Sequence, residues 1–155
     1  MKIVIQTDAS VQETTLSITC KEINPELERL ISVFRLSDKK LSAKKNGEVH
    51  LIDLKTVLYV ESLERNTFIY TGEEVYESTY RLYELESMLG ECNFVRVNKS
   101  TLLNLNKIKS IKSDIDRRIR VTLENGYQLI ISRSYAEEFK TKIFKLGVSN
   151  AKTID

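Results

Sequence analysis

The chain has a single histidine, two cysteines and no tryptophan among its 155 residues. One histidine leaves too few imidazoles for most metal sites and most acid–base schemes. The cysteines, Cys20 and Cys92, lie far apart and lack the spacing of a metal-ligand pair. The sequence therefore predicts no metal site and no cofactor. Two thiols in a chain without an export signal predict a reduced, cytoplasmic protein.

Long hydrophobic runs are also absent. No segment approaches the roughly 20 apolar residues that a bilayer-spanning helix needs, and residues 1–8 become polar too early for a signal peptide. We therefore expect no direct membrane insertion. Glycine-rich phosphate loops, nucleophile motifs and clustered carboxylates are missing as well, so the sequence predicts that the protein is not an enzyme.

The charge of the chain is unevenly distributed. The net charge is only +2, yet residues 61–91 carry two basic and eight acidic side chains (2 − 8 = −6) and residues 92–133 carry nine basic and three acidic ones (9 − 3 = +6). Such a basic segment is able to form a positive face for a nucleic acid. Pairing of the two blocks with each other, or plain solvation of both, explains the same pattern.

Residues 1–45 predict a small strand-strand-helix arm. Residues 2–6 and 15–20 are β-rich. Asn24-Pro25-Glu26 is typical of a helix start, because Asn caps the helix, Pro fits its first turn and Glu favours the positive end of the helix dipole. Apolar residues then recur at helical spacing, at Leu27, Leu30, Ile31 and Phe34. Residues 37–47 are polar and lysine-rich without periodicity, which predicts a linker.

Residues 46–147 predict short antiparallel strands and few helices, and residues 148–155 a polar tail. Asn125-Gly126, between two β-rich runs, is a strong hairpin signal. Leucines spaced at 82, 85 and 89 predict one short helix, and Ser134 with Glu137 predicts a capping box at the start of a last helix. The predicted fold class is mainly β (α+β overall), an elongated antiparallel sheet domain with a few short helices, preceded by the arm.

The run Phe-Val-Arg-Val-Asn-Lys-Ser-Thr-Leu-Leu-Asn at residues 94–104 is the most informative stretch, and it suits a strand ending in a polar loop. Three further motifs accompany it in order: Val-Leu-Tyr-Val-Glu-Ser at 57–62, the leucine-spaced helix at 82–86, and Ser132-Arg133 after the Asn-Gly hairpin. Over about two-thirds of the chain, this ordered set resembles the LytTR family of bacterial DNA-binding domains.

The resemblance implies a regulator of transcription in which loops, rather than a recognition helix, enter successive major grooves of double-stranded DNA. It also implies a homodimer on two half-sites, or two protomers side by side. Many members have His where Asn98 stands and Arg where Lys99 stands, which changes the hydrogen bonds offered there. Only about 45 residues precede the β domain, too few for the receiver domain of the best-known members. The chain is similar to the short free-standing form, and we expect its arm to serve dimerisation or partner sensing.

Polar residues in three expected loops are the candidates for reading bases. An arginine donates to guanine O6 and N7, and an asparagine reads adenine. Asn98 either reads a base or caps its own loop, and Asn66 either touches DNA or allows a left-handed turn. The candidates are Asn66, Thr67, Asn98, Lys99 and Arg133.

Phosphate contacts position a protein on DNA without specifying a sequence. The candidates for them are Arg65, Ser100, Lys107, Lys109 and Lys112. The three lysines equally resemble any solvated strand face. Arg96 lies among apolar residues, so we expect it to pair with a carboxylate such as Glu61 or with loop carbonyls. For Arg117, Arg118 and Arg120, protection of a sheet edge is the preferred interpretation.

Two other functions compete with binding to duplex DNA. The chain is alternatively a non-catalytic protein-interaction module that uses the arm and the basic face. Aromatic residues on expected strands, Tyr59, Phe68, Tyr70 and Tyr76, would suit stacking on RNA bases. Their alternation with apolar neighbours indicates a hydrophobic core instead.

Overall fold

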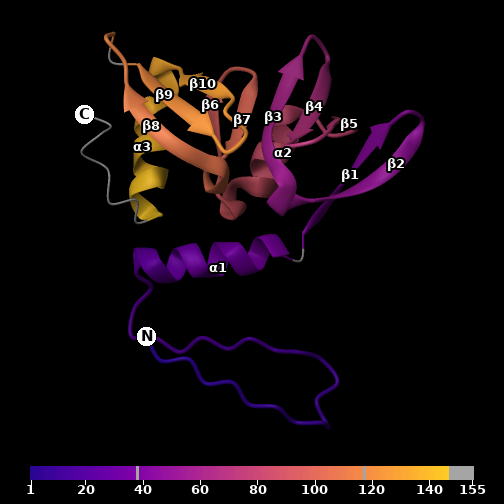
Figure 1. The fold of residues 1–155 in the computed structure, drawn as a ribbon, viewed down its shortest axis with the longest axis vertical. Helices are drawn as coiled ribbons and strands as arrows, with labels where there is room; N and C mark the ends of the chain where they lie inside the picture. The colour runs from indigo at the N-terminus through magenta and orange to yellow at the C-terminus, as the bar shows by residue number, and fades with distance from the viewer. Residues whose placement is uncertain (38, 117, 147–155) are drawn as a thin grey trace.

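The computed structural model describes residues 1–37, 39–116 and 118–146, without the side chains of residues 32, 33 and 35–37. These residues form three α-helices and ten strands, all paired antiparallel (Figure 1). The predicted mainly β class with few helices is confirmed. The helices are α1 (Pro25–Ser37), α2 (Leu82–Leu89) and α3 (Ala136–Lys145).

The strands form a seven-stranded sheet, ordered β2-β1-β5-β4-β3-β7-β6, and a three-stranded sheet, ordered β10-β9-β8. The larger sheet contains β1 (Lys40–Lys45), β2 (Glu48–Asp53), β3 (Val57–Leu63), β4 (Asn66–Thr71), β5 (Val75–Ser78), β6 (Phe94–Asn98) and β7 (Thr101–Asn104). The smaller contains β8 (Ile108–Ser113), β9 (Ile119–Leu123) and β10 (Gln128–Ile131).

Two hydrophobic clusters lie on opposite faces of the larger sheet. The first includes Val95 and Leu103 with the smaller sheet and with Phe139 of α3. The second includes Phe94 and Leu102 with the leucines of α2. Successive residues of a strand point to opposite faces, so β6 and β7 contribute alternately to both clusters. These two central strands are therefore fixed from both sides.

The linker prediction for residues 37–47 is wrong, because most of that range is strand β1 and its turn. Leu41 and Ala43 are buried, whereas Lys40 and Lys44, on either side of them, are exposed. Asn46 and Gly47 both have positive φ, 52° and 78°, and close a two-residue hairpin onto β2. The signal is an Asn-Gly turn of the favoured hairpin kind, which the surrounding lysines obscured.

The prediction of strands at residues 2–6 and 15–20 is also wrong. Residues 1–24 are exposed and contain no strand. A high β propensity reflects packing against neighbouring strands, and these segments have no partner strand in the described part of the chain. The predicted helix start is confirmed, since the Asn24 side-chain oxygen accepts from the Leu27 N–H at 2.8 Å.

Helix α1 lies beside two 3₁₀ turns, Leu54–Thr56 and Gly90–Cys92, at the end of the sheets opposite the β3–β4 hairpin tip (Figure 1). No helix in the described part of the chain is long and apolar enough to span a membrane. The predicted tail at residues 148–155 lies outside the described residues.

Candidate nucleic-acid interface

Three turns that are far apart in the sequence meet at one end of the sheets. The Ser62 N–H, at the end of β3, donates to the Ser100 carbonyl in the β6–β7 turn at 2.7 Å. The Ser132 N–H, just after β10, donates to the Val97 carbonyl of β6 at 2.8 Å. Figure 1 shows the tips of the β3–β4 and β6–β7 hairpins at the same upper edge of the molecule. The three turns, each of which holds one basic side chain, therefore share one end of the fold.

The β3–β4 turn consists of Glu64 and Arg65, since Leu63 pairs with Asn66 across the hairpin. The left-handed residue is Glu64, with φ 57°, and not Asn66, which begins β4. The interpretation of Asn66 as a left-handed turn residue is therefore wrong. Arg65 and Asn66 are exposed, whereas Thr67 is only 3% exposed. Thr67 is a core residue because its side chain points to the buried face, out of reach of a base edge.

The side chain of Asn98 holds the β6–β7 turn. Its oxygen accepts hydrogen bonds from the Ser100 N–H at 2.8 Å and from the Ser100 hydroxyl at 3.1 Å. This is the loop-capping alternative. Lys99, at the tip of the turn, is exposed. With the oxygen of Asn98 engaged in the turn, its amide nitrogen is the group left to donate to a partner.

The side chain of Arg96, on β6, also holds the β6–β7 turn. Its Nη1 donates to the Lys99 carbonyl at 2.6 Å, and its Nε and Nη2 donate to Glu86 of α2 at 3.0 and 2.8 Å. The predicted structural role of Arg96 is thus confirmed, but its carboxylate partner is Glu86 and not Glu61. Arg96 shares the α2 face of the sheet with Phe94. Glu61 lies on the other face, where it accepts from the Tyr70 hydroxyl at 3.3 Å.

Arg133 is exposed in a 3₁₀ turn, Arg133–Tyr135, that joins β10 to α3. Helix α3 follows directly at Ala136, and its first residues have no side-chain cap. The predicted capping box at Ser134 and Glu137 is therefore wrong, because the 3₁₀ turn already continues the helical path. The turn fixes Arg133 between the strand β10 and the helix α3.

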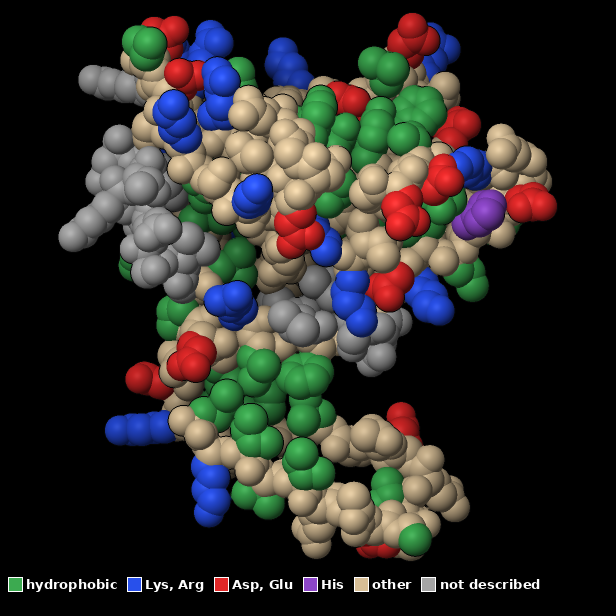
Figure 2. Space-filling model, viewed as in Figure 1, with side chains coloured by type: hydrophobic (Ala, Val, Ile, Leu, Met, Phe, Trp, Pro, Cys, Tyr) green, Lys and Arg blue, Asp and Glu red, His purple; other side chains and the backbone are tan. Residues whose placement is uncertain are grey.

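The remaining basic candidates lie on the smaller sheet. Lys109 and Lys112 are exposed on β8, while Ile108 and Ile111 pack against the core. Figure 2 shows basic side chains over the β8–β9 hairpin and at the tips along the upper edge, with acidic side chains among them, and further acidic ones over β1, β2 and β5. The basic side chains thus extend from the smaller sheet towards the three turns.

Arg120 forms an ion pair from β9, the central strand of the smaller sheet, so the predicted protection of a sheet edge is wrong for this residue. Its Nη2 lies 2.8 Å from the Asp114 carboxylate, and its Nη1 lies 3.4 Å from the Gln128 side chain. The Ile115 N–H and, after it, Arg120 lower the pKa of Asp114 below 3.8, its ordinary value. These contacts support a structural role for Arg120. Arg118 is exposed, and Arg117 lies outside the described residues.

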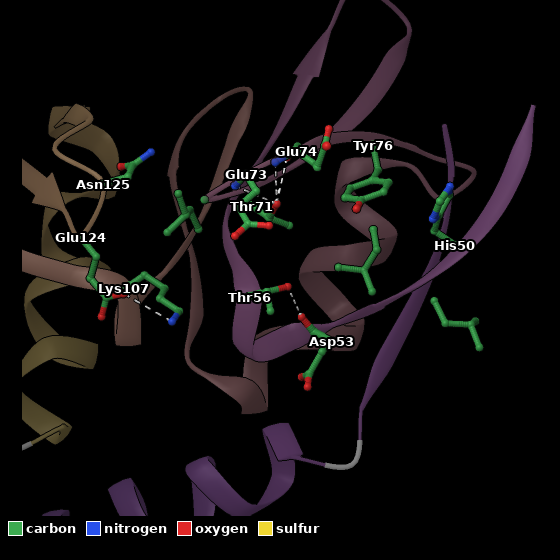
Figure 3. Close-up of a pocket in the computed structure, with 14 residues that line it drawn as sticks. His50, Asp53, Thr56, Thr71, Glu73, Glu74, Tyr76, Lys107, Glu124 and Asn125 are labelled. Atoms are coloured by element: carbon green, nitrogen blue, oxygen red, sulfur yellow. Dashed lines mark hydrogen bonds and ion pairs between the residues drawn. The ribbon is translucent and has the colours of Figure 1, made fainter. Parts of the chain in front are cut away.

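An open groove of about 610 Å³ lies between β2, the β4–β5 turn and the β9–β10 turn (Figure 3). Of the predicted site residues only Lys107 lines it, with its Nζ 3.4 Å from Glu124. Other carboxylates line the groove at Asp53, Glu73 and Glu74. Because this lining is mainly acidic, the groove does not suit a phosphate backbone. Among the described residues no three His, Cys, Asp or Glu side chains converge as metal ligands.

Two tyrosines of the larger sheet, Tyr59 and Tyr70, form a stack with Tyr127 of the β9–β10 turn. Tyr59 lies between Tyr70 and Tyr127, with ring centroids 4.4 and 5.2 Å away and planes tilted by only 12° and 10°. Tyr59 is 6% exposed, and this burial raises its pKa well above the ordinary value of a tyrosine. Both of its faces are covered, so it offers no surface on which a base would stack. The predicted core role is confirmed for Tyr59.

Comparison with known proteins agrees with this fold. The LytTr DNA-binding domain family matches residues 47–144, and the chain belongs to this family. A solved LytTr DNA-binding domain from Bacillus cereus is 25% identical and superimposes with a TM-score of 0.64, covering 68% of this chain and 97% of that domain.

Two kinds of curated relatives match. The sensory transduction protein LytT of Enterococcus faecalis is 32% identical over 95 residues, which are 61% of this chain and 39% of that protein. Uncharacterized HTH-type transcriptional regulators of Staphylococcus aureus are 25% identical over 145 residues, 92% of this chain and 98% of theirs. Similarity to the staphylococcal proteins therefore extends through most of the N-terminal arm.

Proposed function

We propose that this protein regulates transcription by binding specific sites in double-stranded DNA through the three turns at one end of its sheets. The observation that carries the proposal is the pair of backbone hydrogen bonds, from Ser62 to Ser100 and from Ser132 to Val97, that join these turns. Each turn presents a basic side chain, at Arg65, Lys99 and Arg133. Strand ladders below the turns hold them in place without a recognition helix.

The side chains divide into two roles. Arg133 donates both arms of its guanidinium to a guanine in the major groove, and Lys99 contacts a guanine or a phosphate. The Asn98 amide nitrogen and Asn66 are the other base-facing groups. Arg65, Lys109 and Lys112 contact phosphates, which sets affinity and register. Ser100 is left out because its N–H and its hydroxyl both donate to Asn98. Thr67 and Lys107 are left out, since one is buried and the other faces Glu124 in the acidic groove.

The staphylococcal relatives of nearly equal length support a free-standing regulator. It acts in the cytoplasm without a cofactor or catalysis, with the arm as a separate unit from the DNA-binding domain. It binds as a homodimer, with one set of three turns on each half-site. A DNA-bound pair engages two half-sites of one operator and gains affinity from their proximity.

Selection from a random duplex library tests the proposal. The wild-type chain is expected to enrich a defined sequence. Arg133→Ala is expected to lose discrimination at one guanine, costing about 1–3 kcal/mol, and Lys99→Ala is expected to alter a different position. Lys55→Ala, an exposed lysine in the 3₁₀ turn beside α1, is the matched control and is expected to select the wild-type sequence. Equal wild-type affinity for selected and scrambled duplexes would overturn the proposal.

A further inference from the structure

The N-terminal segment, residues 1–24, is exposed along its whole length and belongs to no strand. Its local hydrogen bonds include those of the turn at Asp8 and Ser10, where the Ser10 N–H and hydroxyl donate to the Asp8 carboxylate. Figure 1 shows the segment running out from the N-terminus, turning and returning to the start of α1. The backbone groups of two β-type runs, residues 2–6 and 15–20, therefore have no ladder partner among the described residues.

The same segment carries much of the exposed apolar surface of the protein. Among the described residues, eight of the twenty exposed large hydrophobic side chains lie within residues 1–24. Ile3, Ile5 and Leu16 are 74%, 86% and 58% exposed. Figure 2 shows the hydrophobic side chains of α1 continuous with this segment, and Phe34 of α1 is 43% exposed. A contiguous apolar surface of this kind marks an interaction site.

We infer that a second copy of this chain covers this surface, with the β-type runs of the two copies pairing as antiparallel strands. Residues 15–20, Thr-Leu-Ser-Ile-Thr-Cys, contain no charged side chain. Charged side chains commonly prevent an exposed strand from pairing with another chain. Antiparallel pairing of this run with its own copy about a two-fold axis sets no like charges against each other.

Charge also favours a second copy over a highly charged partner. Residues 1–24 carry two basic and three acidic side chains, 2 − 3 = −1. A segment so close to neutral does not repel its own copy, and it offers no strong field to an acidic or basic protein. Pairing also satisfies the exposed backbone groups and buries the alternating residues Leu16 and Ile18 against apolar partners.

The dimer contact itself does not depend on the proposed function, but its use in DNA binding rests on that function. Two joined copies present two sets of turns to DNA, so that binding of the first raises the effective concentration of the second. The arm lies at the α1 end of the molecule, opposite the turns. Dimerisation there leaves the candidate interface open.

Light scattering on the full chain at micromolar concentration tests the contact. The wild-type mass is expected to be twice 17.9 kDa. Ile18→Lys is expected to give monomers, because it sets lysines close together across the two-fold axis. Ile18 lies in the exposed segment, so the monomeric variant is expected to keep the helix signal and the cooperative thermal transition of the folded domain. Val49→Lys, at a 66% exposed apolar position on β2, is the matched control and is expected to stay dimeric. A monomeric wild type, or a dimeric Ile18→Lys variant, would overturn the inference.

Titration with duplexes that hold one or two half-sites separates this inference from the proposed function. Ile18→Lys is expected to bind a single half-site as tightly as wild type and to lose roughly 100-fold in affinity for the two-site duplex. A wild-type dimer that binds DNA without sequence preference would contradict the proposed function but not the dimer contact. A monomeric wild type that still selects a sequence defeats the dimer contact alone.

Discussion

The guanidinium of Arg96 and the main-chain carbonyl of Lys99 are joined by a hydrogen bond of 2.6 Å. The same guanidinium is held by Glu86, so α2 reaches the tip of the β6–β7 turn through two side chains. A charged donor makes such bonds stronger than neutral ones. The position of Lys99 at the candidate interface therefore depends on α2, a helix that packs on one face of the larger sheet.

We expect Arg96→Ala to weaken DNA binding although Arg96 itself is only 15% exposed. The lost bond to a main-chain carbonyl is worth about 1.5–3 kcal/mol, as for other charged donors. A double-mutant cycle with Glu86→Ala, read by chemical unfolding and by DNA titration, measures the coupling. The cycle should show the two substitutions to be non-additive in both readouts. Additive losses would mean that Glu86 does not orient the guanidinium.

Asn98→Asp separates the two roles of this side chain. The carboxylate oxygen still accepts from the Ser100 N–H and hydroxyl, so we expect thermal unfolding to change little. The substitution removes the amide donor and adds negative charge beside the phosphates, so DNA affinity is expected to fall by about 1–3 kcal/mol. Asn98→Ala is the companion variant, expected to lower both stability and affinity. Wild-type affinity in Asn98→Asp would show that Asn98 serves the turn alone.

Lys109→Ala is expected to weaken binding to selected and to scrambled duplexes by the same factor. If Lys109 neutralises one phosphate, the slope of log K against log salt becomes shallower by about 0.9. Titrations at several salt concentrations measure this slope. Lys55→Ala, at the opposite end of the molecule, is expected to leave the slope unchanged, and a Lys109 variant with the wild-type slope would exclude the phosphate contact.

The Asp114–Arg120 pair is expected to make a pH-dependent contribution to stability. The pKa of Asp114 is lowered in the folded protein, so the ionised form is the favoured one. The stabilisation is complete above the unfolded-state pKa, near 3.8, and is lost as the pH falls through the lower folded-state value. Tm measured against pH should show Asp114→Asn below wild type at neutral pH and the two curves converging in acid. A constant difference at every pH would contradict the ion-pair origin.

Glu64 occupies the left-handed region with φ 57°, which suits Asn or Gly better than Glu. Glu64→Asn is therefore expected to raise the free energy of unfolding by up to about 1 kcal/mol. It also removes a negative charge beside Arg65, so DNA binding should tighten at low salt. Thermal unfolding and titration at two salt concentrations check both effects. A destabilised Glu64→Asn variant would show that the Glu64 side chain contributes to the turn.

Two local signals in the sequence predicted the structure correctly. Asn125-Gly126 predicted its hairpin, and Asn24 with Pro25 predicted the start of α1. The failures have physical reasons of their own. Residues 2–6 and 15–20 have the composition of strands, yet strand formation needs a partner that composition does not reveal. The reverse holds for β1, where lysines on the exposed face concealed buried Leu41 and Ala43.

The candidate site was predictable residue by residue but not in its construction. The family resemblance selected Lys99 and Arg133 as exposed loop residues, and both are exposed. Which carboxylate supports Arg96 depended on the face of the sheet, and that face is set by strand register. The bonds from Ser62 to Ser100 and from Ser132 to Val97 join residues more than 30 positions apart, and no local pattern encodes them.

Both of those long-range bonds use main-chain atoms alone. A substitution at Arg65, Lys99 or Arg133 leaves every such fastening intact, so recognition and folding are separable in this molecule. Through mutation, proteins with this scaffold can therefore change the side chains at the turns and adopt new operators, while the sheets that carry the turns stay the same.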